Sequence, residues 1–346
     1  LGLLVGCIAS FLVFVSAPIL AEWMGAAARV HEHAVTYIRI RSLGGPAVLF
    51  SMVSFGILYG LVDMRTPLLI ALAVNGLNIV LDALLIFGFG PLPALGIGGA
   101  ALASALSQLL GAFWCAIAVY KKIGFTFHVN AADIVKLLAI GREMFIRTGM
   151  LIVFLLLATR SATRLGPEAG AAHQAVRQVW MFTSLLLDAA AISAQSVVGY
   201  YFGSGRPVQA IRVAGLVCRW SLVIGIGLLI CMLATTTPVS DLLVPASALR
   251  LFGPAWTVAA VFQPLAALAF VTDGIHWGTG DFRYLRNAVS MATIAGSAVL
   301  LLLEAAGLIS LTLVWWCTGL WILIRAGLGM LRIWPGFSGS PLRRGL

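Results

Sequence analysis

The sequence predicts an all-α, polytopic membrane protein with about ten transmembrane helices in two pseudo-symmetric lobes. Composition is the first observation: hydrophobic residues make up 61% of the 346 residues and charged residues only 10%, against roughly 25% charged residues in soluble domains. A water-soluble fold cannot bury this much apolar surface. Long apolar windows and an internal repeat are the second and third observations. The net charge of +10 fits basic cytoplasmic loops better than nucleic-acid binding.

Apolar windows follow one another from end to end, each close to the roughly 20 residues that a helix needs to cross a bilayer. They cover residues 1–20, 38–61, 66–89, 98–120, 144–163, 171–199, 212–236, 253–277, 286–303 and 308–331. They lack the alternation of a β-barrel, and helices satisfy their backbone groups within the segment. Pro46, Pro254 and Pro264 lie in or near these windows, where proline is expected to kink a helix.

Lys and Arg are divided unevenly between the two alternating sets of connecting segments. The richer set holds Arg65, Lys121, Lys122, Lys136, Arg142, Arg206, Arg212, Arg283 and Arg286, with Arg332, Arg343 and Arg344 in the tail. The poorer set holds Arg29, Arg160, Arg164 and Arg250. The positive-inside rule therefore places the richer set and the C-terminus in the cytoplasm, in a multi-pass protein of the inner (plasma) membrane.

An internal repeat divides the chain. Gly56-Ile-Leu-Tyr-Gly-Leu-Val-Asp-Met-Arg65 aligns without a gap with Gly274-Ile-His-Trp-Gly-Thr-Gly-Asp-Phe-Arg283. Internal repeats are typical of secondary transporters. We expect an incomplete N-terminal lobe of about four helices over residues 1–120, a cytoplasmic linker over 121–142, a C-terminal lobe of six helices over 143–332 and a cytoplasmic tail over 333–346. The two spans within 144–199 have no counterpart in the first half, so the expected intact form has twelve helices.

Asp82 is the first candidate site residue, because a lone carboxylate in the middle of an apolar span is costly and usually functional. Asn78 lies one helical turn earlier on the same face. With the hydroxyl of Ser104 on the next span, these oxygens make either a Na⁺ site or a proton relay. The alternative is a purely structural role, in which these polar side chains hold two packed helices together.

A second group of candidates lies in the span over 171–199. Asp188 is deep in that span with Gln195 two turns on, and a polar and aromatic stretch precedes them: Gln174, Arg177, Trp180 and Met181. In a cavity, aromatic and methionine side chains suit flat, apolar, cationic substrates. The alternatives are a structural hydrogen bond for Asp188 and interface anchoring for the stretch.

Three further acids and the cysteines receive structural interpretations. Asp273 is expected to cap its helix or to pair with Arg283 or Arg286, and Asp63 and Asp281 to cap helices at short loops. The cysteines lie in apolar surroundings without a CxxC pair, which predicts neither a disulfide nor a zinc site.

Several stretches resemble the multidrug and toxin extrusion (MATE) family, and within it the DNA-damage-inducible protein F branch. These stretches are 37–47, 63–67, Asn75-Gly-Leu-Asn-Ile-Val-Leu-Asp82, 96–104, Ala171-Ala-His-Gln174, 187–195 and 273–281. The resemblance implies an alternating-access antiporter that exports small organic, often cationic and amphipathic compounds in exchange for H⁺ or Na⁺, without another cofactor. It also implies an ion-coupling role at Asn78, Asp82 and Ser104, and the absence of the family's first two spans.

Other functions remain open at this stage. One is a lipid-linked oligosaccharide flippase of the same superfamily, which should place clustered Arg and Lys inside its cavity. Another is a truncated fragment that does not transport. A membrane-embedded transferase needs an acidic metal-binding motif that the sequence lacks, so we do not expect an enzyme. The expected partners are a small-molecule substrate and the bilayer, not nucleic acid, and the expected state is a monomer.

Overall fold

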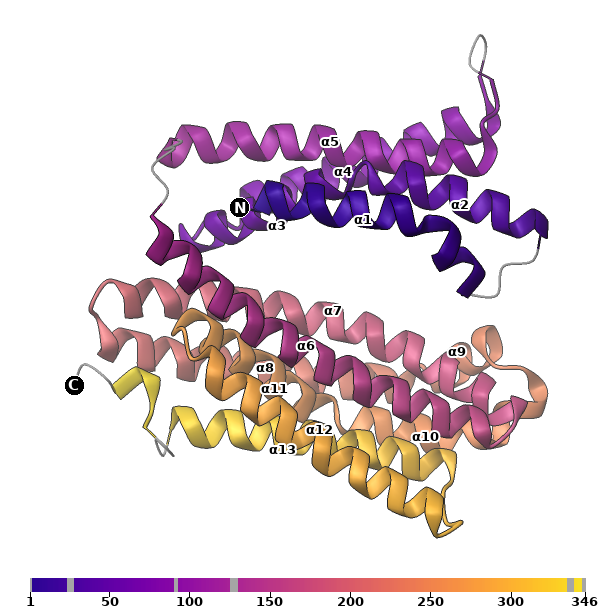
Figure 1. Cartoon of the computed structure of the whole chain (residues 1–346). Helices are drawn as coiled ribbons and strands as arrows, with labels where there is room; N and C mark the ends of the chain where they lie inside the picture. Colours follow the sequence, from indigo (N-terminus) through magenta and orange to yellow (C-terminus); the bar gives the residue numbers. More distant parts are fainter. Residues whose placement is uncertain (1, 24–27, 90–92, 125–129, 335–338, 344–346) are drawn as a thin grey trace. The chain divides into compact units, whose positions relative to one another are not determined.

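The structure, a computed structural model, describes residues 2–23, 28–89, 93–124, 130–334 and 339–343 (Figure 1). The chain separates into two compact units, Leu1–Asn130 and Ala131–Leu346, and each is described by itself. The first unit contains α1 (Gly2–Trp23), α2 (Ala28–Ser42), α3 (Gly45–Gly60), α4 (Arg65–Phe87) and α5 (Gly96–Ile123). The second contains α6 (Ala131–Arg164), α7 (Pro167–Gly203), α8 (Pro207–Ala234), α9 (Thr236–Leu243), α10 (Leu249–Val261), α11 (Gln263–Gly278), α12 (Phe282–Ala305) and α13 (Leu311–Ile333), with short 3₁₀ turns at Ala246–Ala248 and Pro341–Arg343.

The predicted all-helical membrane fold is confirmed. Among the described residues, seven helices are long and apolar enough to cross a bilayer, and two bent pairs raise that number to nine. The remaining predicted window, 144–163, lies within α6. Large apolar side chains face outward along these helices, as Ile79 of α4 and Leu302 of α12 do with 70% and 68% exposure, which is the surface expected against lipid.

Two of the predicted spans are broken helices. The window 38–61 divides into α2 and α3 with a bend of 44°, and the window 253–277 divides into α10 and α11 with a bend of 45°. In both, proline occupies the first turn of the second helix: Pro46 in α3 and Pro264 in α11. Proline lacks the N–H that would continue the preceding helix, so the predicted kinks occur there. Pro254 instead lies inside α10.

The sequence repeat corresponds to a repeat of the fold. Helix α1 packs on α2, α3 packs on α5, and α4 packs on α5; the same relations join α8 to α10, α11 to α13, and α12 to α13. Figure 1 shows α12 and α13 side by side in orange and yellow. At an offset of 218 residues (274 − 56), even a backbone detail recurs: Val62 has φ 60° and Gly280 has φ 72°. Helices α6 and α7 have no counterpart among the described residues of the first unit.

Two glycines allow close contact between neighbouring helices. A Cβ at Gly99 would lie 2.2 Å from the carbonyl oxygen of Leu85, and one at Gly274 would lie 2.1 Å from that of Ala191. Small residues at such crossings let helix backbones approach each other. The first contact brings α5 against α4, and the second brings α11 against α7. These approaches place the candidate polar residues of each pair of helices near one another.

Candidate functional site

A cavity of about 320 Å³ lies inside the second unit, between α6, α7, α11 and α13. Its walls are mainly apolar and aromatic, and four charged side chains reach it. The lining residues are Arg147, Leu151, Leu155, Trp180, Met181, Ser184, Leu185, Asp188, Ala191, Phe270, Asp273, Trp277, Trp321 and Arg325. Mostly apolar walls with a few converging polar groups are typical of small-molecule sites.

Asp273 is clamped by two arginines at one wall of this cavity. Arg147 and Arg325 both donate from Nη2 to the same carboxylate oxygen, Oδ2, and the Arg325 bond is 2.8 Å long. All three side chains are buried, with 5–7% of each residue exposed. The guanidinium of Arg147 also lies 5.0 Å from the ring centre of Trp277, and that of Arg325 lies 4.7 Å from Trp321. The cluster is held by both ion pairing and cation–π contact.

The predicted partners of Asp273 were wrong. Asp273 points into the unit from α11, whereas Arg283 and Arg286 lie beyond the following loop on α12. Arg286 contacts Glu143 of α6 instead. The prediction looked for a partner close in sequence, but the actual partners come from α6 and α13.

Asp188 is the cavity's other acid, and its situation differs. It is half-buried on α7 and lines the same cavity. It makes no hydrogen bond or ion pair with the residues that the structure describes. It is therefore the carboxylate in this cavity that is free to take a proton or to pair with a cationic group.

The predicted cavity residues divide into two sets. Asp188, Trp180 and Met181 line the cavity, whereas Gln195, Gln174 and Arg177 are not among its lining residues. Arg177 donates to Gln174 at 3.3 Å on the more exposed side of α7, so the two are on one face as expected but pair with each other.

Two charged cavity residues were missed by sequence reasoning. Arg147 and Arg325 are basic residues inside apolar windows, and the cost of an intramembrane charge could have drawn attention to them. Only acidic residues were considered in that way. With both arginines included, the sequence would have indicated a buried cluster, although not its geometry.

The predicted ion-coupling residues of the first unit lie on α4 and α5. Asn78 donates from Nδ2 to the hydroxyl of Ser104 over a long 3.4 Å. Asp82 lies one turn further along α4, and its Oδ1 is buried without a hydrogen-bond partner among the described residues. The structure thus joins Asn78 to Ser104 directly. It also shows a buried carboxylate oxygen of Asp82, one turn from Asn78 on α4, that is unsatisfied among the described residues.

The two repeat-related loop acids form different contacts. In the first unit, Asp63 accepts from the backbone N–H of Thr66 at 3.0 Å and from Lys122 at 2.8 Å. It caps α4, as predicted, and the Lys122 and Thr66 hydrogen bonds lower the pKa of Asp63 well below its usual range.

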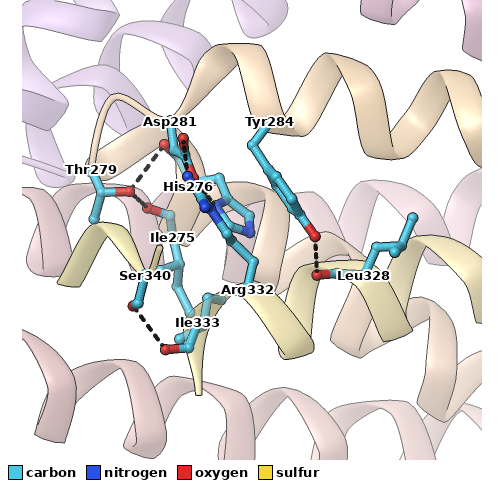
Figure 2. Close-up of polar contacts among 9 residues, drawn as sticks. All are labelled: Ile275, His276, Thr279, Asp281, Tyr284, Leu328, Arg332, Ile333 and Ser340. Atoms are coloured by element: carbon cyan, nitrogen blue, oxygen red, sulfur yellow. Dashed lines mark hydrogen bonds and ion pairs between the residues drawn. The ribbon is translucent and has the colours of Figure 1, made fainter. Parts of the chain in front are cut away.

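In the second unit, Asp281 does not cap α12 with its side chain, so this part of the prediction was wrong. Its two oxygens accept from Arg332 Nε at 2.8 Å and Nη2 at 3.1 Å. His276, fully buried, places Nδ1 3.4 Å from Oδ2 (Figure 2). Burial opposes ionisation of Asp281, but His276 and Arg332 outweigh it and lower the pKa to about 2.

A metal site or a disulfide would need suitable side chains that lie close together. The described part of the chain holds no group of three or more His, Cys, Asp or Glu side chains able to share a metal ion. The five cysteines are free, and three of them are buried, as small apolar residues often are.

Repeated helical units with broken helices and charges buried beside a cavity are features typical of the class of secondary membrane transporters. The particular family follows from comparison: the chain belongs to the MatE family, whose profile matches residues 1–84 and 143–302. The predicted family is thereby confirmed, and it is a family of transporters and not of enzymes.

Curated relatives come from plants and bacteria. The chain is 30% identical to Protein DETOXIFICATION 43 of Arabidopsis thaliana over 100% of its own length and 65% of that protein. It is 35% identical to the chloroplastic Protein DETOXIFICATION 44 over 83% of the chain and 54% of the relative. DNA damage-inducible protein F of Escherichia coli strain K12 is 25% identical over 90% of the chain and 68% of that protein. The chain thus spans between half and two thirds of the length of the first plant relatives.

Solved structures share the fold. A crystal structure of MATE in the bent conformation superposes with a TM-score of 0.88 at 19% identity, over 99% of this chain and 77% of that one. A MOP superfamily transporter from Pyrococcus furiosus, described as having a binding pocket of reverse polarity, gives a TM-score of 0.86 at 19% identity, over 99% and 77%. At this identity the likeness establishes the fold alone.

Proposed function

We propose that the protein is a secondary antiporter that exports small organic compounds in exchange for H⁺ or Na⁺ by alternating access. The observation that carries this proposal is the second-unit cavity with its free acid, Asp188. Antiport requires that ion and substrate do not occupy the protein together, and a carboxylate that holds either a proton or a cationic group meets that requirement. The aromatic walls at Trp180 and Trp277 suit the flat, apolar part of an amphipathic substrate.

The second element of the proposal is an ion-coupling site in the first unit. Asp82 is its acid, and Asn78 and Ser104 supply neutral oxygens, which together match the hard-oxygen ligands of Na⁺ or a short proton relay. The unsatisfied Oδ1 of Asp82 supports this role, because a buried polar oxygen without a partner is costly unless it is used.

Efflux from liposomes tests both roles. The purified protein is reconstituted, a pH or Na⁺ gradient is imposed, and export of a fluorescent organic cation is followed. We expect Asp82→Asn to lose gradient-driven export by about tenfold or more, a loss comparable to removing one strong electrostatic contact. We expect Asp188→Asn to raise KM for the cation more than it lowers kcat.

The matched control is Asp241→Asn, which changes an exposed acid of α9 and should leave transport unchanged. Full coupled export in Asp82→Asn would refute the coupling site. An unchanged KM in Asp188→Asn would refute the cavity as the substrate site. No export of cation under either gradient by the unaltered protein would refute the function with a cationic substrate.

A specific observation favours a second candidate, export of organic anions. Arg147 and Arg325 share one carboxylate oxygen, so a protonated Asp188 leaves the cavity with an excess positive charge. A flippase of anionic lipid-linked sugars, which the sequence leaves open, requires clustered basic residues inside its cavity, and this pair supplies two of them. Export of a carboxylate dye, abolished by Arg325→Gln and absent for the cationic dye, would favour this candidate.

The membrane setting is part of the proposal. The basic residues of the connecting segments support a multi-pass protein of the inner (plasma) membrane with a cytoplasmic C-terminus. We propose a monomer, because the cavity lies within one unit of one chain.

A further inference from the structure

A second cavity, of about 660 Å³, lies within the second unit where α11 ends and α12 begins, beside the end of α13, and its lining shares no residue with the first. It is bounded by the first half of α6, the loop between α11 and α12, the first turns of α12 and the end of α13. Its lining residues are Lys136, Ala139, Ile140, Glu143, Gly280, Asp281, Phe282, Arg283, Tyr284, Asn287 and Arg332. The proposed transport cycle gives this cavity no role.

Both carboxylates of the second cavity are already neutralised. Asp281 accepts two hydrogen bonds from Arg332. Glu143, 3% exposed, is paired with Arg286 and with Arg142. These acids therefore offer little attraction to a further cation, and they fix the arginines that surround the cavity.

Two cations of the lining are left over. Lys136 and Arg283 are exposed and make no ion pair with the described residues. They approach from different helices, α6 and α12, and both face the same cavity. The cavity thus carries an excess of positive charge with two flexible donors at its mouth.

The first turn of α12 adds backbone donors. Its first N–H groups have no partners within the helix, and its cap residue makes no side-chain hydrogen bond to them. The repeat supplies an internal comparison. In the first unit Asp63 accepts from the backbone N–H of Thr66, whereas in the second unit the equivalent Asp281 accepts from Arg332 instead. Tyr284, at the position of Thr66, donates its hydroxyl to Leu328 O at 2.9 Å (Figure 2). The start of α12 therefore lacks the side-chain cap that Asp63 provides at the start of α4.

We propose that this cavity binds a phosphate group, carried by the headgroup of an anionic phospholipid or by a soluble phosphate compound. Lys136 and Arg283 donate to the phosphate oxygens, and the uncapped start of α12 supplies N–H groups and the positive end of its dipole. Basic pockets between helices at the membrane surface are suited to anionic headgroups. The volume accommodates a phosphate together with a glycerol-sized substituent.

The test uses the full chain in nanodiscs of phosphatidylcholine, with or without phosphatidylglycerol, and in detergent with inorganic phosphate. Native mass spectrometry measures retained phosphatidylglycerol, and the thermal midpoint is read with each probe. We expect Lys136→Gln and Arg283→Gln each to weaken retention about fivefold, and the double variant about thirtyfold. Arg283→Lys should keep most of the binding. The control is Arg206→Gln, an exposed arginine on the same predicted side but outside the cavity.

The outcomes are distinct. Selective loss of phosphatidylglycerol in the double variant supports a lipid headgroup. A rise in thermal midpoint with inorganic phosphate, lost in the same variant and unaffected by lipid, supports a soluble phosphate. Equal retention in the double variant and in Arg206→Gln, with no response to inorganic phosphate, overturns the proposal. Because both altered side chains are exposed, loss of folding is not expected, and the thermal midpoint without ligand checks this.

Discussion

Replacing Asp273 by Asn should strongly destabilise the second unit, although the two side chains have nearly the same shape. The change removes the one negative charge between two buried guanidinium groups and leaves two like charges with weaker acceptors. Hydrogen bonds to charged groups contribute about 1.5–3 kcal/mol each, and Asp273 accepts two. Loss of one partner from a buried ionic cluster typically costs about 3–5 kcal/mol. For a unit of this size that corresponds to a fall in thermal midpoint on the order of 10 °C.

The assay is thermal unfolding of the purified protein in detergent, followed by tryptophan fluorescence, because Trp277 and Trp321 contact the two arginines. Asp188→Asn is the matched control: it alters the other cavity acid, which pairs with no described residue, and should shift the midpoint little. Adding Arg325→Gln to Asp273→Asn should restore part of the loss by relieving the repulsion. Equal stability of Asp273→Asn and the unaltered protein would refute the electrostatic reasoning.

Two further predictions concern the repeat-related loops. Asp281 has a pKa lowered to about 2, so its contribution to stability is present above about pH 4 and is lost as pH falls toward 2. The difference in thermal midpoint between Asp281→Asn and the unaltered protein should therefore shrink from pH 7 to pH 3. A difference that stays constant over this range would contradict the reasoning. Val62 and Gly280 share a left-handed backbone, which costs a β-branched residue about 1–2 kcal/mol. Gly280→Val should therefore lower the stability by about that amount while Val62→Gly causes no loss, and equal effects of the two in thermal unfolding would contradict the argument.

Much of the fold could be predicted because its causes are local. A run of apolar residues long enough to cross the bilayer becomes a helix wherever it occurs, and a proline at 46 or 264 breaks it by removing one N–H. The repeat was also visible, since Gly56 and Gly274 begin segments with the same pattern. The short helix α9, within a connecting segment, was not predicted, because its eight residues give too short a pattern.

The candidate sites were less predictable because they depend on which helices meet. Of the predicted set, Asn78 and Ser104 are in contact, because α4 and α5 are consecutive and α5 crosses α4 closely at Gly99; their predicted ion-coupling role stays a prediction. The cluster around Asp273 brings together residues 126 and 52 positions away in the chain. No spacing rule relates such positions. Only the packing order of α6, α11 and α13 decides that both arginines reach one oxygen.

The two units share a repeated helix arrangement but carry their acids at different positions of the repeat. At the repeat offset, Asp273 of the second unit corresponds to Phe55 of the first, and Asp82 of the first corresponds to Leu300, which is fully buried. Each of these two acids is therefore matched by an apolar residue in the other unit. Helix packing and the broken span need the same backbone in both units, so glycines, prolines and the left-handed turn recur. A charge in the bilayer is tolerated only where it has a function or a partner. The two units offer different partners, so they carry their acids at different positions of the repeat. The fold of such a protein can thus be inferred from its repeat, whereas its functional residues must be sought at the positions where the two halves differ.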